Sequence, residues 1–163
     1  MGARASRPAE DSSAREIFIT RVFDAPRKLV FEAWSELRHV AQWWGPRGFS
    51  CTFEKFELRQ GGEWIFVMHG PDGRDYPNWL VFTEVVKPER LVYSHGGGEE
   101  DHTTDFQSTV TFEAQGNRTK VTMRALFPSA AERDRVVEEY GAIEGGQQTL
   151  ERLGEHLGRM ARR

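Results

Sequence analysis

The sequence predicts an α+β domain in which a curved antiparallel sheet of about seven strands surrounds one long C-terminal helix. Two observations lead to this fold class. From 52 to 127, apolar residues recur mostly at every second position and glycine-containing turns separate the segments, as in a series of antiparallel strands. From 143 to 160, the apolar spacing changes to three and four residues, which is typical of one face of an amphipathic helix.

The first part of the chain is expected to combine a strand with two short helices. The strand is predicted over 16–23. Asp24 is predicted to cap the helix that follows, and Pro26 is tolerated in the first turn because the N–H that proline lacks has no helical partner there. A second short helix is expected over about 37–43, and the Gly45-Pro46 pair ends it.

The remaining strands follow one another through short turns, which favours an antiparallel meander. After them, Ser129 is predicted to cap the helical region, with Glu132 in the position of a capping box. The apolar stripe of the last helix is expected to pack on one face of the sheet, which is a helix-grip arrangement. The strands are expected over 52–58, 64–68, 78–86, 90–95, 106–113 and 119–127.

Length and composition indicate one ordinary globular domain. The chain has 163 residues, 38% hydrophobic and 29% charged, with a net charge of −3. We expect a domain over 15–163 and a disordered leader over 1–14. The charge balance argues against nucleic acid as a partner, and no apolar run approaches the ~20 residues that span a membrane. The single cysteine, Cys51, excludes an intrachain disulfide, reads as a small core residue and favours a cytoplasmic location.

Six short motifs resemble, in order and spacing, those of one protein superfamily. They are Asp24-Ala25-Pro26 with Val30-Phe31, Trp43-Trp44-Gly45-Pro46, Arg59-Gln60-Gly61-Gly62-Glu63-Trp64, Met68 with Gly70-Pro71-Asp72-Gly73, Phe82-Thr83-Glu84-Val85, and Pro88-Glu89-Arg90-Leu91-Val92-Tyr93. Together they resemble the START-like, or SRPBCC (Bet v 1-like), superfamily. Within it they are most similar to the group named for the C-terminal domain of the activator of the heat-shock protein 90 ATPase. The resemblance runs from about 17 to 157.

The resemblance implies a helix-grip fold with a deep cavity between the sheet and the C-terminal helix. Members bind lipids, sterols, polyketides, plant hormones or aromatic compounds, and a few catalyse cyclisations or hydrolyses. The chaperone activator has a separate N-terminal domain that supplies much of its chaperone contact, and we expect no counterpart of it within these 163 residues. A chaperone contact is therefore left open and is not inferred from the family name.

Ligand-binding residues are predicted between the inward-facing side of the strands and the apolar side of the C-terminal helix. Trp64, Phe66 and Met68 alternate along one strand and should line one wall. Gly145 and Gly146 lie inside the last helix, and Gly146 is on its apolar stripe. The missing side chain of Gly146 is expected to leave space for a ligand, and the two glycines can also mark a kink or a break between two helices. By contrast, Trp34 and Phe112 are expected in the core. The predicted ligand-binding set is Trp44, Trp64, Phe66, Met68, Phe82, Glu84, Tyr93, Gly146 and Leu150.

Glu84 is the polar residue of this set. It alternates with Phe82 and Leu80, so we expect its carboxylate to face the interior, where it needs a partner or takes up a proton. Arg59 and Tyr93 are the candidate partners, and an exposed position is the alternative. The histidines show none of the spacings of known metal sites, so the sequence predicts no metal, no cofactor and no catalytic residue.

Three functional hypotheses follow. The first is a binding module for a small hydrophobic, aromatic or polyketide-like molecule. The second is a cyclase, hydratase or hydrolase that uses Glu84, His69, Tyr76 or His95 as acid or base. The third is an interaction domain for a chaperone or regulator, and a homodimer is also left open. Because no catalytic constellation is recognisable, the sequence favours the binding module.

Overall fold

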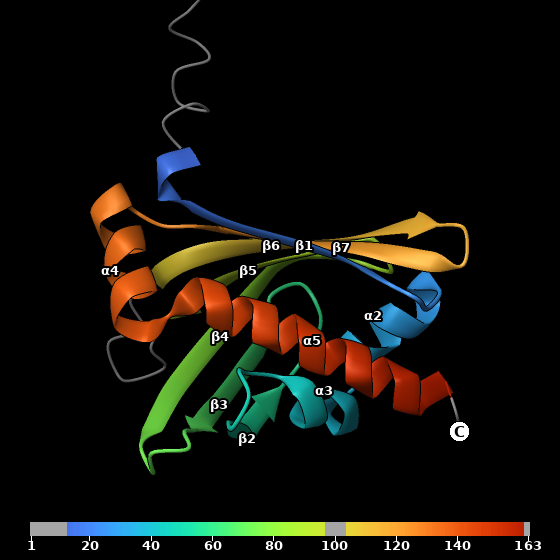
Figure 1. Cartoon of the computed structure of the whole chain (residues 1–163), viewed down its shortest axis with the longest axis horizontal. Helices are drawn as coiled ribbons and strands as arrows, with labels where there is room; N and C mark the ends of the chain where they lie inside the picture. The colour runs from blue at the N-terminus through green and yellow to red at the C-terminus, as the bar shows by residue number, and fades with distance from the viewer. Residues whose placement is uncertain (1–12, 97–103, 162–163) are drawn as a thin grey trace, which may run out of the picture.

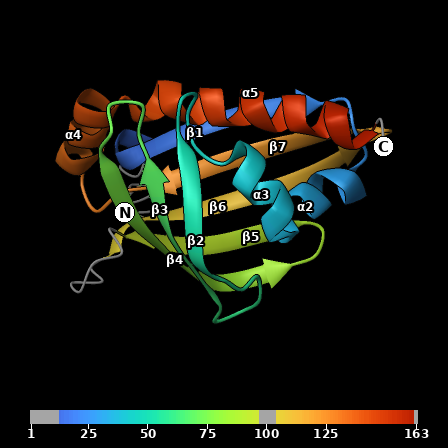
Figure 2. The same ribbon diagram turned by 90° about the horizontal axis from the view of Figure 1, so that it is seen from below.

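The computed structural model describes residues 13–96 and 104–161. A curved seven-stranded antiparallel sheet, in the order β1-β7-β6-β5-β4-β3-β2, wraps around the long helix α5 (Ala142–Ala161) (Figure 1; Figure 2). The predicted helix-grip fold is thereby confirmed. The other elements are η1 (Ser13–Arg15), β1 (Glu16–Phe23), α2 (Arg27–Ser35), α3 (Leu37–Trp43), β2 (Ser50–Phe56), β3 (Glu63–His69), β4 (Asp75–Val86), β5 (Arg90–Gly96), β6 (Thr104–Gln115), β7 (Arg118–Leu126) and α4 (Ala130–Tyr140).

Two β-bulges help to bend the sheet. One lies between Phe53 and Lys55 in β2, and the other lies between Phe82 and Glu84 in β4. An extra residue in one strand bends that strand and increases its twist, so the bulges contribute to the curvature around α5. They also lengthen the step between inward side chains from two residues to three, so that Phe53 and Phe56 both pack against the core.

Helix α2 packs on β6 and β7 and on α3, and large aromatic side chains fill this part of the core. Trp34 of α2 and Trp43 of α3 are fully buried, with ring centroids 4.9 Å apart. Phe112 of β6 meets Trp34 edge-on at 5.6 Å. Such edge-to-face pairs contribute about 0.5–1.5 kcal/mol beyond the burial of their area. The prediction that Trp34 and Phe112 are core residues is confirmed.

The helical region at the C-terminus is divided at Gly141. As expected, α4 is capped by Ser129, whose hydroxyl accepts a hydrogen bond from the backbone N–H of Glu132 at 3.1 Å. The helix ends at Gly141, which adopts the left-handed conformation (φ 59°, ψ 44°) that glycine enters without steric cost. Helix α5 then continues through Gly145 and Gly146. The predicted break at these two glycines is therefore wrong, and the break lies at Gly141.

In the N-terminal part, the structure differs from the predicted helix cap at Asp24 and from the predicted leader over 1–14. The N-cap of α2 is Pro26 without a side-chain hydrogen bond, because Asp24 lies too far ahead of the first helical residue to act as its cap. The Asp24 carboxylate instead lies 3.8 Å from the guanidinium of Arg118. Of the leader predicted over 1–14, residues 1–12 lie outside the described residues, whereas Ser13–Arg15 form η1. Within the described part of the chain, no helix is both long enough and apolar enough to cross a membrane.

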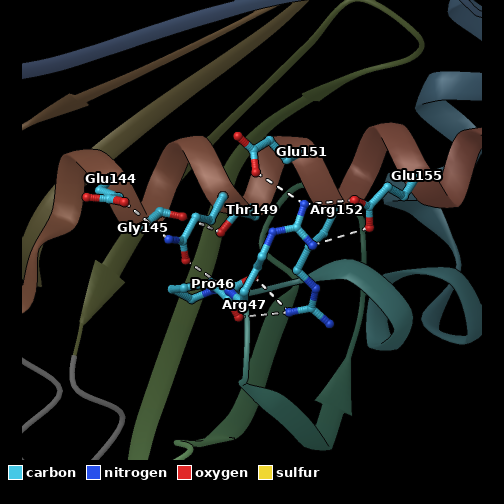
Figure 3. A network of polar contacts seen from close by, with 10 residues as sticks. Pro46, Arg47, Glu144, Gly145, Thr149, Glu151, Arg152 and Glu155 are labelled. Carbon is cyan, nitrogen blue, oxygen red and sulfur yellow. Dashed lines mark hydrogen bonds and ion pairs between the residues drawn. The ribbon is translucent and has the colours of Figure 1, made fainter.

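Arg152 of α5 holds the loop between α3 and β2 against the long helix (Figure 3). Its Nη1 donates to the carbonyl oxygens of Gly45 and Pro46, at 2.8 and 3.0 Å. Its Nη2 donates to the carbonyl oxygen of Gln42 at 3.1 Å. A planar guanidinium offers several N–H donors at once, so one side chain satisfies backbone acceptors from successive loop residues. Burial lowers the pKa of Arg152.

Arg47, in the same loop, contacts the exposed side of α5 (Figure 3). Its guanidinium lies 3.2 Å from the carboxylate of Glu151 and 2.7 Å from that of Glu155. Hydrogen bonding to Arg47 lowers the pKa of Glu155. Exposed ion pairs of this kind contribute little to stability, because water and salt screen them. The half-buried Arg152 is therefore the main connection between the loop and the helix.

We expect Arg152→Lys to lower the free energy of unfolding by about 2–3 kcal/mol, because an ammonium cannot reach the loop carbonyls in one plane. Urea unfolding followed by circular dichroism measures the effect. The matched control is Arg159→Lys, on the exposed side of the same helix, which should change stability by less than about 0.5 kcal/mol. Equal effects at the two positions would contradict the role of Arg152.

Candidate functional site

The inner face of the sheet, which looks toward α5, is the candidate site. The strand register places His95 of β5 between Leu80 of β4 and Phe106 of β6. Two residues earlier in β5, Tyr93 points to the same face because side chains alternate along a strand. Polar groups are thus set among apolar ones on a concave surface. We divide this face into a closed half and an open half by the burial of its side chains.

The closed half is completely packed. Trp44, which follows α3, has its ring centroid 5.3 Å from that of Trp64 and 6.2 Å from that of Phe66. None of these three residues is more than 7% exposed. Trp64 and Phe66, two of the three residues predicted as one wall of a pocket, therefore pack here with Trp44 as core, whereas Met68 stays half-buried. Among the described residues, the indole Nε1–H of Trp64 is buried without a hydrogen-bond partner.

The open half lies toward α4 and is only partly covered. The start of β1 pairs with the end of β7, which in turn pairs with the start of β6, so these three strand ends lie at the same edge of the sheet. Helix α4 contacts β1 and therefore lies near this edge. Side chains of the inner face keep some access to solvent there, in contrast to the closed half. The half-buried residues of the open half are Met68, Tyr76, Asn78, His95, Phe106, Met123 and Ala125.

His95 and Asn78 form a hydrogen-bonded pair in the open half. The Nε2 of His95 lies 2.7 Å from Oδ1 of Asn78, whose Nδ2 donates to the carbonyl oxygen of Tyr76 at 2.9 Å. Because the amide nitrogen is committed to Tyr76, its oxygen faces the imidazole, and His95 donates through Nε2–H. The neutral ring then keeps on Nδ1 a lone pair that can accept a hydrogen bond. Burial lowers the pKa of His95 to about 4, which keeps the ring neutral near pH 7.

Tyr93 provides a second polar group. Its side chain is 2% exposed, and its ring centroid lies 5.3 Å from that of Phe82. Burial raises the pKa of the phenol to about 12, and a hydrogen bond with the side chain of Ser108 offsets part of this effect. The phenol is therefore neutral near pH 7 and can both donate and accept a hydrogen bond.

Sequence reasoning does not find Asn78, Ser108 and Phe106. A signal for the two polar residues is nevertheless present in the strand pattern. Asn78 has the same parity as the buried Leu80 in β4, and Ser108 has the same parity as the buried Val110 in β6. A polar residue in an inward position of an alternating strand is unusual and needs a hydrogen-bond partner, which makes it a candidate site residue.

Glu84 does not face the interior. The bulge in β4 changes the alternation, so that Val85 packs against the core in the place expected for Glu84. The Glu84 carboxylate accepts hydrogen bonds from Arg90 at 3.2 and 2.6 Å, and its side chain is 42% exposed. Hydrogen bonding to Arg90 lowers the pKa of Glu84. The partner is thus neither Arg59 nor Tyr93, and Glu84 is excluded from the candidate site.

Gly146 does not open space for a ligand. A Cβ atom at this position would lie 2.5 Å from Cδ1 of Ile19 on β1. The missing side chain therefore lets α5 approach β1, and Ile19 fills the expected gap. Gly145 likewise faces Pro46, whose Cγ would lie 3.3 Å from an added Cβ. Leu150, predicted for the opposite wall, is fully buried.

The acid and base residues of the enzyme hypothesis are not brought together. Tyr76 and His95 lie on the inner face, whereas His69 lies on the outer face. The two ring nitrogens of His69 contact the Thr52 hydroxyl and the Asp75 carboxylate, each at 2.8 Å. A hydroxyl, an imidazole and a carboxylate in a row resemble a nucleophile with its base. The His69 side chain is 39% exposed, so water competes for each of these contacts.

Two shallow hollows lie along the seam between β1 and α5. One has a volume of about 290 Å³ and is bordered by Ile19 and Gln147, among others. The other has a volume of about 630 Å³ and is bordered by Arg47 and Gly154, among others. Of the predicted ligand-binding set, Leu150 borders the first hollow and no member borders the second. These hollows are therefore not the predicted pocket.

The curved antiparallel sheet and the long helix across its concave face define a START-like domain of the SRPBCC superfamily. The chain belongs to the family described as Activator of Hsp90 ATPase homolog 1-like protein, whose model matches residues 24–158. The resemblance inferred from the sequence motifs is thereby confirmed. Comparison with curated proteins gives no match.

Several solved structures share this fold. A protein from Arthrobacter aurescens is 30% identical, with a TM-score of 0.83 over 91% of this chain and 89% of that chain. A protein from Mycobacterium smegmatis is 26% identical, with a TM-score of 0.83 over 92% of this chain and 95% of that chain. A protein from Nitrosomonas europaea is 24% identical, with a TM-score of 0.80 over 93% of this chain and 99% of that chain, and this likeness shows the fold alone.

The half-buried His95 should make stability depend on pH. Its pKa is about 4 in the fold and about 6.5 in the unfolded chain, so the unfolded state binds more protons between these values. Stability is then complete above about pH 6.5 and falls as the pH drops toward 4. We expect His95→Gln to reduce by about 2 kcal/mol the difference in unfolding free energy between pH 6.8 and pH 4.8, measured by urea unfolding. An unchanged pH dependence in the variant would contradict a His95 ring that stays neutral in the folded state.

The contact between Gly146 and Ile19 should appear in a double-mutant cycle. Gly146→Ala is expected to destabilise the fold by about 1–2 kcal/mol, because its Cβ meets Cδ1 of Ile19 and this outweighs the ~1 kcal/mol that alanine gains in a helix. In an Ile19→Val background, which lacks Cδ1, the same change should be neutral or stabilising. Additive effects in urea unfolding would show that the two residues do not meet.

Proposed function

We propose that the protein binds a small, largely apolar molecule on the open half of the inner face. The observation that supports this is the partial exposure of Met68, Phe106 and His95 on the concave side of a sheet whose other half is fully packed. Small-molecule sites are usually concave and apolar, with a few convergent polar groups. The open half has this composition, and membership of a START-like family is consistent with it.

His95 is the anchor in this proposal. Asn78 holds Nε2 of the ring, and this fixes both the ring orientation and the tautomer. The Nδ1 lone pair is then an acceptor for a hydroxyl or N–H group of the ligand. A neutral imidazole offers no charge to an anion, so we expect an uncharged ligand with one hydrogen-bond donor on an apolar body.

The expected affinity is in the micromolar range. Burial of about 200–300 Å² of apolar ligand surface, at ~25 cal/mol per Å², contributes about 5–7.5 kcal/mol. One hydrogen bond adds about 1 kcal/mol. The loss of translational and rotational freedom on association reduces this sum, which leaves an affinity typical of a small ligand in a partly open site.

A chaperone partner is the alternative that the family description raises. The ligand-binding proposal accounts for more of the described structure. A surface contact with another protein gives no role to the pairing of His95 with Asn78 on the inner face, or to the pairing of Tyr93 with Ser108.

A pair of probes that differ by one hydroxyl tests the proposal. We expect 2-naphthol to bind at least about fivefold more tightly than naphthalene, because its hydroxyl can donate to Nδ1 of His95. Quenching or shifting of tryptophan fluorescence measures both affinities. In His95→Leu, the preference for 2-naphthol should disappear while naphthalene binding stays within about twofold of the parent protein.

The matched control is His69→Leu, which removes an imidazole from the outer face and should leave both affinities unchanged. Circular dichroism confirms that each variant is folded, and His95→Gln serves as a second inner-face variant. The proposal is wrong if neither probe binds, or if the preference for 2-naphthol survives in both His95 variants.

A further inference from the structure

We propose that Glu32, Glu36 and His39 form a binding site for a divalent transition-metal ion of the zinc type, at the junction between α2 and α3. Glu32 lies in α2, Glu36 lies between the two helices and His39 lies in the first turns of α3. One ligand atom from each residue lies within 4.8 Å of the other two. The site is separate from the inner face of the sheet and independent of the ligand proposed there.

The distances suit a metal ion. The Nε2 of His39 lies 3.5 Å from a carboxylate oxygen of Glu32 and 3.9 Å from one of Glu36. In a tetrahedral site with bonds of about 2.0–2.1 Å, neighbouring ligand atoms are about 3.4 Å apart. Both separations are too long for a good hydrogen bond and need only a small closure to hold one ion.

The buried nitrogen is the independent sign of a ligand. The His39 side chain is 5% exposed, and its Nε2 is fully buried without a hydrogen-bond partner in the described part of the chain. A buried polar atom in this state costs about 1–3 kcal/mol unless something pairs with it. The Nε2 is directed at the two carboxylates, and an ion bound between them would give this nitrogen its missing partner.

A further residue orients the imidazole. The Nδ1 of His39 lies 2.8 Å from Nε2 of His156 on α5. If Nδ1 carries the proton and donates to His156, Nε2 keeps the lone pair that a metal needs. Metal-bound histidines commonly use their second nitrogen in this way, because the contact fixes the tautomer and the ring orientation.

Arg38 occupies part of the site in the absence of a metal. Its Nε donates to the Glu36 carboxylate at 2.8 Å, and its Nη2 lies 3.9 Å from the Glu32 carboxylate. The side chain is 64% exposed, so it can turn into solvent when an ion arrives. Arg38 is therefore a competing cation, and its removal should strengthen metal binding. A purely structural role for the three ligands predicts no such gain.

The donor set indicates the class of ion. One imidazole nitrogen and two carboxylate oxygens suit Zn²⁺, Mn²⁺ or Co²⁺ better than Ca²⁺ or Mg²⁺, which favour sites made of oxygen alone. The spacing Glu36-x-x-His39 resembles the Glu-x-x-His pattern with which helices bind metals in some bundles. Sequence reasoning predicts no metal site, because neither the second carboxylate nor the burial of the imidazole is visible in that pattern.

Calorimetric titration of the full chain, without a purification tag, with ZnCl₂ tests the site. We expect one Zn²⁺ per chain, with at least about tenfold weaker binding in Glu36→Gln and in Glu32→Gln. Arg38→Ala should bind about fivefold more tightly, since a competing charge near 4 Å is removed. Long-range ¹H–¹⁵N spectra of the imidazoles should show Zn²⁺ at Nε2 of His39 in preference to the other four histidines.

Matched controls separate this site from casual binding at the surface. Glu132→Gln and Arg135→Ala change an exposed ion pair on α4 without a nearby histidine and should leave Zn²⁺ affinity unchanged. His69→Gln removes the histidine–carboxylate pair formed with Asp75 and should also have no effect. The proposal is overturned if no Zn²⁺ binds, if binding is lost with His69, or if both glutamate variants bind Zn²⁺ as tightly as the parent chain.

Discussion

The hydrogen bonds from Arg152 to the loop between α3 and β2 are the interaction on which the rest of the structure depends. They join a charge on the long helix to the backbone carbonyls of Gln42, Gly45 and Pro46 in one turn of the chain. An exposed ion pair could not replace them, because water competes for such a pair, whereas an unsatisfied buried carbonyl costs about 1–3 kcal/mol. Trp44 directly precedes this loop, its carbonyl oxygen accepts a hydrogen bond from Arg152, and its ring packs against Trp64 in the aromatic core. The position of the loop therefore also affects the packing of the closed half.

The closed half of the inner face contributes to stability through aromatic packing, whereas the open half carries the polar groups of the proposed ligand site. In the closed half, aromatic rings pack against one another, and among the described residues the buried indole N–H groups of Trp34 and Trp64 have no hydrogen-bond partner. In the open half, His95 and Tyr93 are held by partners of their own, so their orientations exist before any ligand arrives. A site preorganised in this way loses less entropy on binding than one that must order its side chains.

Local pattern accounts for much of this fold, and long-range contacts account for what the pattern misses. The alternation of Trp64 and Phe66 correctly predicts that they face α5, because strand parity is a local property. The prediction that Glu84 faces the interior is wrong because the bulge that turns this residue outward depends on how β4 pairs with β5. The prediction that Gly146 leaves space for a ligand is wrong because Ile19, from the opposite end of the chain, fills that space.

The same distinction applies to the polar residues. The inward parity of Asn78 can be read from its strand, but its pairing with His95 is set by the position of one strand beside another. His69 and His95, both candidates for acid or base in the enzyme hypothesis, cannot act together because the two rings lie on opposite faces of the sheet. Spacing along the chain cannot show this when the residues belong to different strands.

The bulge in β4 has a consequence for how this strand can change during evolution. Thr83 is the additional residue, because Phe82 and Glu84 pair with consecutive residues of β5. Loss of Thr83 would leave Phe82 inward, Glu84 outward and Val85 inward, in regular alternation. In a strand without a bulge, a deletion of one residue turns every later side chain to the opposite face. Deletion of the Thr83 codon would therefore shorten this strand by one residue and alter the bend of the sheet, while the same side chains of β4 would still face the core.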